Sequence, residues 1–525
     1  MKQDLVRALK KVLNEEIEVI VEPPKNSTFG DYTTNIALSL AKKLKKNPNE
    51  VAKDLAQKLK AENIQGIGEI EVVGGFINFR LSNEYLHKQA QAIIKQGSKY
   101  GSSDLGKGKK ASVEFISANP TGPLHIGNAR GGPLGDVLSN VLEKVGYEVA
   151  REYLHNDVGG QVKKLGQTLY YAIHSDEKSE EELAYKGDYI KELASKLSGK
   201  VKKGADFEEV GRMGVQILFE EIMSEVEKMG IKFDKVRKES DLRKDVPRVL
   251  EELQKKSVLK EKDGALWFAP SDEFLKDRET VVKKSDGELT YFASDIVYHK
   301  EKFESGPDLV IDVLGGNHSG HVPRLQAAVK ALGFDVSKFH VILYQFVRIK
   351  KGTEVVKMSK RAGDFVTARE VLDQVGKDAF RFFLLMSGPD THMDFDIDLA
   401  SLRSSENPVF SVQYAHSRME SIFKKAGKLV NPEFKLLKEE EELELLRKLV
   451  KFPEMILEIS ENFSVHWLTA YALELSNSFH KFYEAHKVIS EDKDLTNARL
   501  SLVAATQIIL KETLDLLGVS APDHM

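Results

Sequence analysis

The pattern of hydrophobic and polar residues in the first hundred residues predicts both helices and strands. Hydrophobic residues recur every three or four positions over Thr33–Leu44 and Val51–Ala61, which predicts two helices. The alternating segment around Gly74 predicts a pair of strands. Residues 97–110 are rich in glycine, serine and lysine, as linkers are. We therefore expect a small N-terminal α+β module over residues 1–105.

The middle of the chain has the pattern of a parallel α/β sheet. Strand-like hydrophobic segments alternate with helical segments at 133–146 and Pro323–Leu332. A charged and helix-rich insertion lies between them, over about residues 165–275. We therefore predict a Rossmann-like parallel-sheet domain with a helical insertion over residues 106–400. The predicted strands are 111–117, 147–155, Asp308–Leu314 and His340–Tyr344.

From about residue 400 to the end, the pattern is almost entirely helical. Leucine, phenylalanine, tyrosine and valine recur at three- and four-residue spacing from Ser411 onward. We predict a C-terminal all-α helix bundle over residues 401–525. The expected fold is of the α/β class, with a small α+β domain before the parallel sheet and a helix bundle after it.

Composition narrows the classes of protein to which the chain can belong. The 525 residues include 77 Lys and Arg, 81 Asp and Glu, and no cysteine, so that the formal net charge is −4. Without cysteine there can be no disulfide, no thiolate nucleophile and no cysteine-ligated metal site. A near-neutral chain does not attract nucleic acid through its overall charge, so any RNA must be bound by local basic groups.

The sequence gives no sign of a membrane segment or of a signal peptide. No hydrophobic run approaches the length that crosses a bilayer. Residues 1–20 alternate charged and hydrophobic side chains at helical spacing, which predicts an amphipathic helix. We expect a cytoplasmic protein with no membrane partner.

A proline- and glycine-rich loop, residues 117–128, follows the first strand of the predicted sheet and precedes a helix. Ligands of such sheets bind at the carboxyl ends of the strands, and free N–H groups at a helix start favour phosphate. Gly127 would allow a nucleotide to approach closely, and His125 could donate a hydrogen bond to a phosphoryl oxygen. Neither of the common phosphate-loop motifs, GxxxxGKS/T and GxGxxG, follows this strand. Taken alone, the loop fits a phosphate site and a tight turn with an exposed histidine about equally well.

A second motif, the pentapeptide Lys357–Arg361, lies between Gly352 and Gly363. Mobile lysines on a glycine-flanked loop suit a reaction in which negative charge moves onto a leaving pyrophosphate. The alternative is a solvated basic loop, which is the usual explanation for a lysine-rich segment. The combination of this motif with the earlier His-x-Gly loop argues against a coincidence.

HIGN at 125–128 followed by KMSKR at 357–361 resembles the two signatures of class I aminoacyl-tRNA synthetases. The wider sequence is similar to the arginyl-tRNA synthetase family over essentially the whole chain, for example in VEFISANPTGPLHIGNARGGPLGD, DGELTYFASDIVYHKEKF and NPVFSVQYAHSR. The resemblance implies that residues 106–400 form the catalytic domain, that 1–105 contact tRNA and that 401–525 bind the anticodon. It also implies ligation of L-arginine to its cognate tRNA through an arginyl-adenylate, with AMP and diphosphate as products.

The resemblance further implies ATP with Mg²⁺ as a substrate and no protein-bound metal. One position departs from the family pattern, because the second histidine of the first signature is Asn128 here, and an asparagine cannot carry positive charge. The residues expected in catalysis are His125, Asn128, Lys357 and Lys360. The residues expected at ATP are Pro120, Gly122, His125, Gly127, Asn128, His318, Lys357, Met358, Ser359 and Lys360.

Tyr291 and Asp295 are four residues apart on a predicted helix and therefore share a face. The resemblance assigns both to the arginine side chain, whose guanidinium a carboxylate can pair bidentately, while the alternative is a solvated carboxylate. Glu114 is a weaker candidate. His318 and His321 have H-x-x-H spacing, but no third metal ligand is evident, so a loop beside the adenosine is the better interpretation. The residues expected at arginine are Asn119, Tyr291, Asp295 and Asn317.

For tRNA, the resemblance indicates residues in both terminal domains. Phe76 matches a position that contacts the D-loop in relatives, although a core aromatic is nearly as good an interpretation. Tyr414 would stack an unstacked base, which is how single-stranded RNA is usually read. The terminal Met525 either approaches the anticodon loop or frays. The residues expected at tRNA are Phe76, Asn78, Gln413, Tyr414, Arg418 and Met525.

The expected partners are the arginine tRNA, ATP and L-arginine, with no DNA, and the family expectation is a monomer. Two other functions fit part of the sequence. A small-molecule adenylyltransferase would use the same His-x-Gly chemistry but would not need the two terminal domains. A catalytically inactive RNA-binding relative is favoured only by Asn128.

Overall fold

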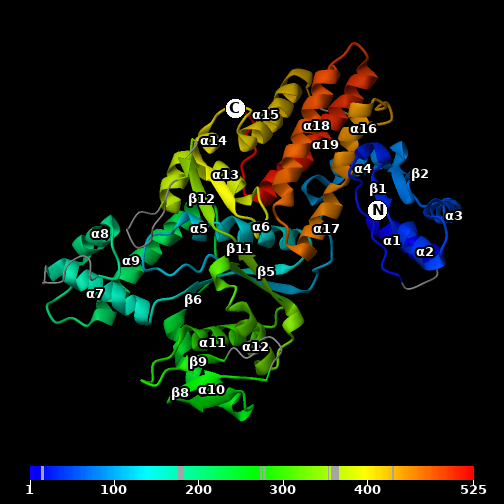
Figure 1. The fold of residues 1–525 in the computed structure, drawn as a ribbon. Helices are drawn as coiled ribbons and strands as arrows, with labels where there is room; N and C mark the ends of the chain where they lie inside the picture. Colours follow the sequence, from blue (N-terminus) through cyan, green and yellow to red (C-terminus); the bar gives the residue numbers. More distant parts are fainter. Residues whose placement is uncertain are drawn as a thin grey trace.

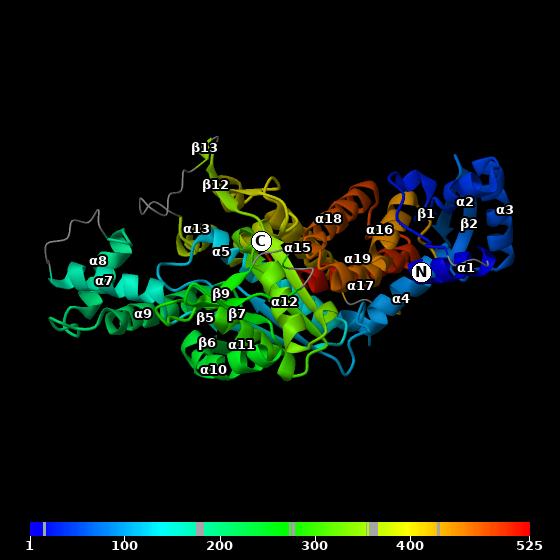
Figure 2. The same cartoon turned by 60° about the horizontal axis from the view of Figure 1, so that its bottom comes forward.

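The elongated molecule has its N-terminal module at one end and an arm, residues 160–228, at the other, with the parallel sheet between them (Figure 1, Figure 2). The C-terminal helices pack against the N-terminal module. No helix in the described stretches is both long enough and apolar enough to cross a membrane. The computed structural model describes residues 1–13, 17–174, 183–271, 275, 279–352, 354–355, 366–427 and 431–525.

The N-terminal module is a three-stranded antiparallel sheet with helices around it. Its strands are, in spatial order, β1 (Tyr32–Thr34), β3 (Phe76–Leu81) and β2 (Ile67–Val73), so the predicted strand pair is β2 and β3. The helix predicted from Thr33 begins only at Ile36, because the preceding residues pair with β3. The helices are α1 (Lys2–Leu13), α2 (Ile36–Leu44), α3 (Pro48–Ala61) and α4 (Asn83–Gln96).

The central sheet confirms the predicted Rossmann-like α/β class. The chain passes from β4 outward to β5 but later returns on the other side of β4 with β10, so the strand order reverses between β4 and β10. In such sheets ligands bind at the carboxyl ends of the strands beside that switch point. The five parallel strands are, in spatial order, β11 (Phe339–Tyr344), β10 (Leu309–Gly315), β4 (Lys110–Phe115), β5 (Glu148–His155) and β6 (Lys235–Lys238).

Helices cover both faces of the sheet. On one face α6 (Gly131–Lys144) approaches so closely that a Cβ at Gly135 would lie 2.2 Å from the Phe115 ring. On the other face lies α11 (Tyr291–Glu304), whose Lys302 pairs with Glu114, the neighbour of Phe115 on β4. Next to α11 lies α12 (Val322–Leu332).

The stretch predicted as one insertion is two groups separated by a strand of the main sheet. The arm consists of α7 (Gly160–His174), α8 (Asp188–Leu197) and α9 (Phe207–Lys228). The chain then returns to the sheet as β6, which is too short and too charged to stand out in the sequence. The second group is α10 (Glu239–Lys255) with an antiparallel sheet of β7 (Leu259–Lys262), β8 (Ala265–Phe268) and β9 (Thr280–Lys283).

A second small sheet and a helical domain follow the central sheet. As the sequence predicts, the chain beyond residue 401 is helical. The elements before it are β12 (Val347–Lys351), β13 (Glu354–Val355), α13 (Ala368–Leu385), β14 (Met393–Asp396) and α14 (Ile397–Ser401). Those of the helical domain are α15 (Pro408–Ala426), α16 (Glu440–Val450), α17 (Phe452–Asn462), α18 (Trp467–Ala485) and α19 (Lys493–Leu517).

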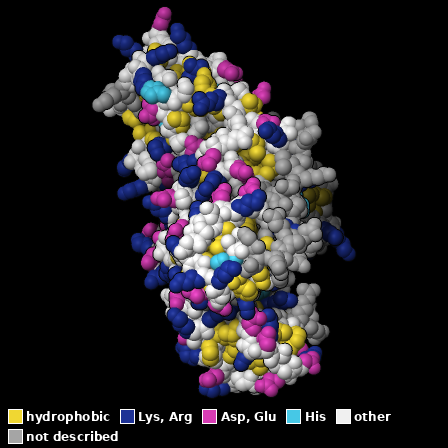
Figure 3. Space-filling model, turned by 90° about the vertical axis from the view of Figure 1, so that its left-hand side faces the viewer, with side chains coloured by type: hydrophobic (Ala, Val, Ile, Leu, Met, Phe, Trp, Pro, Cys, Tyr) yellow, Lys and Arg dark blue, Asp and Glu magenta, His cyan; other side chains and the backbone are white. Residues whose placement is uncertain are grey.

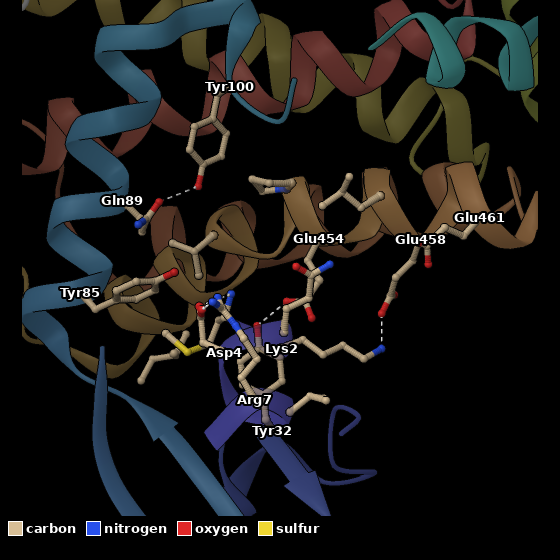
Figure 4. A pocket seen from close by; sticks show the side chains of 17 residues that line it. Lys2, Asp4, Arg7, Tyr32, Tyr85, Gln89, Tyr100, Glu454, Glu458 and Glu461 are labelled. Carbon is tan, nitrogen blue, oxygen red and sulfur yellow. Dashed lines mark hydrogen bonds and ion pairs between the residues drawn. The ribbon is translucent and has the colours of Figure 1, made fainter. Parts of the chain in front are cut away.

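The N-terminal module meets the C-terminal domain around a cavity of about 590 Å³. Figure 4 shows Tyr32 and Lys2 of the module opposite Glu454 and Glu458 of α17. The Tyr32 hydroxyl donates a hydrogen bond of 2.6 Å to Glu454, and Lys2 pairs with Glu458. Burial raises the pKa of the Glu454 carboxyl above its usual value. Polar contacts thus join the first and last domains of the chain.

One buried arginine joins four segments. Arg381 of α13 is fully buried, and its guanidinium donates to Asp136 of α6 at 2.6 Å. It also donates to the carbonyls of Met229, after α9, at 3.0 Å and of Leu517, at the end of α19, at 2.8 Å. The approach requires Gly518, whose φ is +67°, because a Cβ there would lie 2.3 Å from the guanidinium. These contacts fix the sheet domain, the arm and the C-terminal domain to one another.

Replacing Arg381 with methionine should destabilise the protein strongly. The change removes the closest donor of the buried Asp136, which keeps the more distant Arg151 at 3.5 Å, and leaves two carbonyls without the guanidinium. Breaking a buried pair in this way typically costs about 3–5 kcal/mol. We expect a clearly lower midpoint of thermal unfolding. The matched control is Arg248→Met, which removes an arginine whose side chain is 69% exposed beside Asp245 and should cost less than about 1 kcal/mol. Equal midpoints for the two variants would contradict the role of Arg381.

A buried glutamate joins the arm to α13. Glu225 of α9 is 3% exposed and forms an ion pair of 3.1 Å with Arg369 of α13. Its Oε2 atom has no hydrogen-bond partner among the residues that the structure describes. Burial raises the pKa of Glu225 to about 7, although Arg369 opposes the shift. Near neutral pH the folded protein therefore holds a proton that the unfolded chain releases.

This proton makes stability depend on pH. Between the ordinary pKa of 4.5 and about 7, the folded state binds more protons than the unfolded state, so stability should fall as the pH rises. In Glu225→Gln the fall of the thermal midpoint across this window should be smaller than in the unmodified protein. Glu227→Gln, at an exposed position on the same helix, should keep the original profile. An unaltered profile for Glu225→Gln would show that Glu225 does not titrate in this window.

Candidate active site

The proline- and glycine-rich loop leaves the carboxyl end of β4, at the switch point of the sheet. It begins with a strained turn, since Ile116 and Ser117 have positive φ angles of 67° and 36°. The Ser117 hydroxyl donates to Glu114 at 2.8 Å and accepts from the backbone N–H of Leu154 on β5 at 3.0 Å. Side-chain contacts to two neighbouring strands therefore hold the strained turn in place.

The backbone of the helix that follows fixes His125. His125 caps α5 (Ile126–Ala129), and its Nδ1 atom accepts a hydrogen bond of 2.9 Å from the N–H of Gly127. In the neutral ring the proton is therefore on Nε2. A Cβ at Gly127 would lie 3.0 Å from Nδ1, so this position has little room for a side chain. The carbonyl of Asn128 accepts from the Tyr344 hydroxyl at 3.3 Å.

The segment that follows the lysine-rich motif lies beside His125. The N–H of Ala368 donates to the Leu124 carbonyl at 2.8 Å, and the N–H of Ile126 donates to the Val366 carbonyl at 3.4 Å. Val366 is the first described residue after that motif. The structure thus brings the chain that leaves the second signature next to the first. The predicted residues Lys357, Met358, Ser359 and Lys360 themselves lie outside the described residues.

Two segments hold the loop from outside. The Asn156 amide, after β5, donates a hydrogen bond of 2.8 Å to the side-chain oxygen of Asn119. The Tyr189 hydroxyl, on the arm, donates one of 3.2 Å to the carbonyl of Thr121. The loop residues predicted at the substrates differ in exposure, since Asn119 is exposed, Gly122 is half-buried and Pro120 is buried.

The residues of α11 that are predicted to bind arginine lie near a second carboxylate and its arginine partner. Tyr291 and Asp295 occupy the first two turns of α11, and Asp295 accepts a hydrogen bond of 2.8 Å from His321. A second carboxylate, Glu239 at the start of α10, is 1% exposed, accepts from the Ser294 hydroxyl at 3.1 Å and forms an ion pair of 3.0 Å with Arg243. Burial, reinforced by the charge of Glu239, raises the pKa of Tyr291. The Asp295 carboxylate, one turn after the exposed Tyr291 ring, suits a guanidinium ligand.

Asn317 and His318 follow β10 in a 3₁₀ turn, Gly316–His318, at the same edge of the sheet as the loop after β4. The rings of His318 and His321 lie 6.4 Å apart. Burial, with a smaller effect of His321, lowers the pKa of His318. The loops after β4 and β10 therefore flank the switch point.

A buried ion network fixes α11 on the sheet. Lys302 is 3% exposed and donates to Glu114 of β4 and, at 2.7 Å, to Asp312 of β10. Burial alone would lower the pKa of Lys302, but the two carboxylates raise it above its usual value. His299 contacts Asp312 at 2.9 Å and the Asp295 carbonyl at 2.8 Å. The expectation that Glu114 contacts substrate is corrected here, because its side chain is buried below the turn and paired with Lys302.

Sequence reasoning misses Lys302, Glu239 and Tyr189. A signal for the first exists, because Asp312 lies inside the hydrophobic strand segment DLVIDVL, and a buried carboxylate requires a cation. Nothing in the sequence distinguishes Glu239 and Tyr189 from the many other charged and aromatic residues of the two groups between β5 and α11.

The two predicted tRNA residues of the N-terminal module differ in exposure. Phe76, at the start of β3, is 39% exposed, so it is not the core aromatic of the alternative interpretation. Asn78 is 4% exposed and lies opposite Thr33 of β1. The position of Phe76 therefore suits a contact with a partner, and that of Asn78 suits a role inside the sheet.

An exposed aromatic cluster lies on α15 and α18. The Tyr414 ring is 40% exposed and stacks on His480, with ring centres 6.1 Å apart and planes at 23°. The Arg418 guanidinium lies 5.5 Å from the centre of the Tyr414 ring and 5.2 Å from that of Tyr483.

On the side of the molecule that carries the arm, lysines and arginines are spread from end to end with acidic side chains among them (Figure 3).

The last residues of the chain are held along α15. The Gln413 amide is 9% exposed and donates to Asp378 and to the carbonyl of Ser520, both at 2.9 Å. Ser417 donates to the carbonyl of Pro522 at 2.8 Å. Gln413 therefore binds the tail of its own chain, while Met525 at its end is 52% exposed.

Comparison with known proteins agrees with this arrangement over the whole chain. The family models described as arginyl tRNA synthetase N terminal domain, tRNA synthetases class I (R) catalytic domain and DALR anticodon binding domain match residues 1–81, 89–384 and 412–525. An arginine–tRNA ligase of Thermotoga maritima is 42% identical over 544 aligned residues, which cover 100% of this chain and 99% of the relative. One of Shouchella clausii is 40% identical, with 98% and 95% covered.

A solved structure supports the same assignment at the level of the fold. The arginyl-tRNA synthetase of Thermus thermophilus superposes with a TM-score of 0.81 at 24% identity, covering 100% of both chains. The catalytic family model spans more than half of the sequence, and the curated relatives match it from end to end. The chain therefore belongs to the arginyl-tRNA synthetase family of class I and is an arginine–tRNA ligase.

Proposed function

We propose that this ligase binds ATP and L-arginine together at the switch point between β4 and β10. The nucleotide lies along the loop after β4, and the arginine side chain points to the start of α11. The observation that carries the proposal is the convergence at one edge of the sheet of His125, the chain leaving the lysine-rich motif, and Asp295. The proposed ATP residues are Pro120, Gly122, His125, Gly127, Asn128, His318, Lys357, Met358, Ser359 and Lys360; those for arginine are Asn119, Tyr291, Asp295 and Asn317.

The reaction needs no nucleophile from the protein. A carboxylate oxygen of arginine attacks the α-phosphorus of ATP, and the bond to the β,γ-diphosphate breaks, giving arginyl-adenylate and diphosphate. A terminal ribose hydroxyl of the tRNA then attacks the carbonyl carbon of the adenylate and releases AMP. The protein contributes by positioning the reactants and stabilising the charge that develops.

His125 supplies a hydrogen-bond donor to this reaction. Because its Nδ1 accepts from Gly127, its Nε2–H is the donor, and the cap holds the ring at the start of α5. Lys357 and Lys360 supply the positive charge for the leaving diphosphate. Asn128 contributes a hydrogen bond at most, since its amide has no charge.

Asp295 confers specificity for the guanidinium. Its contact with His321 fixes the carboxylate and still leaves acceptor capacity for a bidentate pair. The Tyr291 ring lies one turn before Asp295 on the same helix, where it can contact the stem of the arginine side chain. Lysine lacks the planar fork of donors and fits this arrangement less well.

Asp295→Asn should raise the KM for arginine by about 10- to 100-fold in ATP–pyrophosphate exchange, because a charged hydrogen-bond partner is lost. The KM for ATP should stay unchanged. Asp308→Asn, at the opposite, amino edge of β10, removes a carboxylate of the same type and should leave both constants as they are. An unchanged arginine KM in Asp295→Asn would remove Asp295 from the specificity pocket.

The terminal domains bind tRNA through exposed aromatic side chains. Phe76 provides the contact from the N-terminal domain, 1–105, and the cluster of Tyr414, Arg418 and His480 provides that from the anticodon-binding domain, 401–525. The ring pair of Tyr414 and His480 is a short stack that an unpaired base can extend, and Arg418 adds positive charge to it. Met525 lies in the same pocket as Gln413 and Ser520 and is exposed there, so we place it among the tRNA contacts. Gln413 and Asn78 contribute from inside the protein by holding the tail and the sheet.

Tyr414→Ala should raise the KM for tRNA in the charging reaction by roughly 5- to 100-fold, since base stacking on an aromatic ring contributes about 1–3 kcal/mol. Tyr414→Phe keeps the ring and should remain close to the original value. The kcat for charging should change little in both. Equal tRNA constants for the alanine and phenylalanine variants would contradict a stacking role.

We further propose that ATP binds as its Mg²⁺ complex, that the enzyme is a monomer and that it acts in the cytoplasm. Exchange assays with each amino acid, with and without the arginine tRNA, separate this function from the two alternatives. Exchange that is specific for arginine supports it. Exchange with an unrelated acid would indicate an adenylyltransferase, and RNA binding without any exchange would indicate an inactive relative.

A further inference from the structure

The arm carries two tyrosines that reach the proposed active site. The rings of Tyr185 and Tyr189 pack against the arm's own hydrophobic core, which includes Val162 and Leu193. Their hydroxyls lie at its border. That of Tyr189 donates to the Thr121 carbonyl at 3.2 Å, and that of Tyr185 donates to the Gln161 carbonyl at 3.4 Å. The body of each side chain is thus anchored in the arm, and its polar end faces another segment.

We propose that Tyr189 is a positioning residue of the ligase, which holds the loop Asn119–Gly122 in the conformation that receives ATP. This inference rests on the nucleotide-binding role proposed above for that loop. It assigns a function in the reaction to the arm, which contributes none of the residues proposed at ATP, arginine or tRNA.

The loop has little means of holding itself. Pro120 and Pro123 have no backbone N–H, and the hydrogen bond from Thr121 N–H to the Asn119 carbonyl, 2.8 Å, lies within the loop. Support for Thr121 from another element comes from the arm, through the Tyr189 hydroxyl on its carbonyl. A Cβ at Gly122 would lie 3.6 Å from the Tyr189 hydroxyl, so the loop rests on this side chain over two successive residues.

The arm is suited to hold the loop because one helix fixes it to the main body. The first part of α9 contributes Val210 and Leu218 to the core of the arm. Its later part contributes Ile222 and Val226 to the main core of the molecule. An unbroken helix of 22 residues therefore passes through both cores, and the Tyr189 hydroxyl is held at a defined place relative to the sheet.

The arm also reaches the arginine side of the site. The Gln161 carbonyl, at the start of α7, accepts the hydrogen bond from the Tyr185 hydroxyl. A Cβ at Gly159 would lie 3.5 Å from the Tyr291 hydroxyl, so α7 begins directly beside that ring. The two tyrosines of the arm thus contact the loop proposed for ATP and the segment beside Tyr291.

Tyr189→Phe removes the hydroxyl and keeps the ring. If the hydrogen bond stabilises the receptive conformation of the loop, its loss lowers the fraction of enzyme that can bind ATP, and the KM for ATP rises in proportion. One hydrogen bond corresponds to a rise of roughly two- to tenfold. At saturating ATP the nucleotide orders the loop, so kcat in ATP–pyrophosphate exchange with arginine and tRNA should stay the same. The midpoint of thermal unfolding should also stay the same.

Tyr170→Phe is the matched control. Tyr170 lies on the same arm, and its hydroxyl accepts from the N–H of Gly204 at 2.9 Å, a contact within the arm. This variant should keep the original KM for ATP. A general weakening of the arm would instead affect both variants alike.

The KM for ATP and the kcat of these variants decide whether the proposal holds. A raised ATP KM in Tyr189→Phe, with kcat unchanged and with Tyr170→Phe unaffected, supports the proposal. An unchanged KM, or a lower kcat at constant KM, overturns it. His125→Ala, measured in parallel, tests the underlying site by itself: if exchange persists at its full rate, the proposed nucleotide site is wrong, whereas lost exchange together with a normal Tyr189→Phe overturns only the role of the arm.

Discussion

The relative placement of the domains depends on the buried guanidinium of Arg381. It meets acceptors on α6, after α9 and at the end of α19, and its partner Asp136 is 245 residues away in the sequence. The planar guanidinium spreads its five N–H donors over two terminal nitrogens and Nε, so it reaches acceptors several ångströms apart, whereas the three donors of lysine all lie on one nitrogen. Arg381 therefore fixes three parts of the molecule to one common point: helix α6 behind the nucleotide loop, the arm and the C-terminal domain. The parts of the site that they carry keep their relative positions.

The two faces of the sheet use different forces. On the α6 face the contact is apolar and close, as Gly135 against Phe115 shows. On the α11 face, Lys302 joins carboxylates from two strands, which is directional and fixes how the helix is rotated about its axis. Buried ion pairs contribute less to stability than to such specificity in many proteins. Here the rotation of α11 decides where Asp295 points. The ion network between α11 and the sheet therefore defines the geometry of the site at the carboxyl edge of the sheet.

Local patterns determine the parts of this fold that can be predicted from the sequence. Alternation and helical spacing predict β2, β3, β10 and α6 because each has a simple periodic environment. The loop at His125 stands out in the sequence because its proline, glycine and histidine residues have chemistry of their own. The direction of Glu114, the burial of Gln413 and the contact of Tyr189 with Thr121 could not be found in this way. Each depends on a partner far away in the sequence, and residue type alone does not specify that partner.

A molecule with a net charge of −4 must bind an RNA through few and local contacts, and the elongated shape determines what those contacts can achieve. Phe76 and the Tyr414 cluster belong to two domains that Tyr32 and Glu454 join directly. If both contact one tRNA, as proposed, each alone contributes only the few kcal/mol of a stacking interaction. The joined domains fix the distance between Phe76 and the Tyr414 cluster. Once an RNA binds one of these two sites, the other site is therefore at a high effective concentration for the rest of the same RNA, provided that the RNA spans that distance. An RNA of another shape gains only one contact, so rigidity between the terminal domains contributes to selection of tRNA.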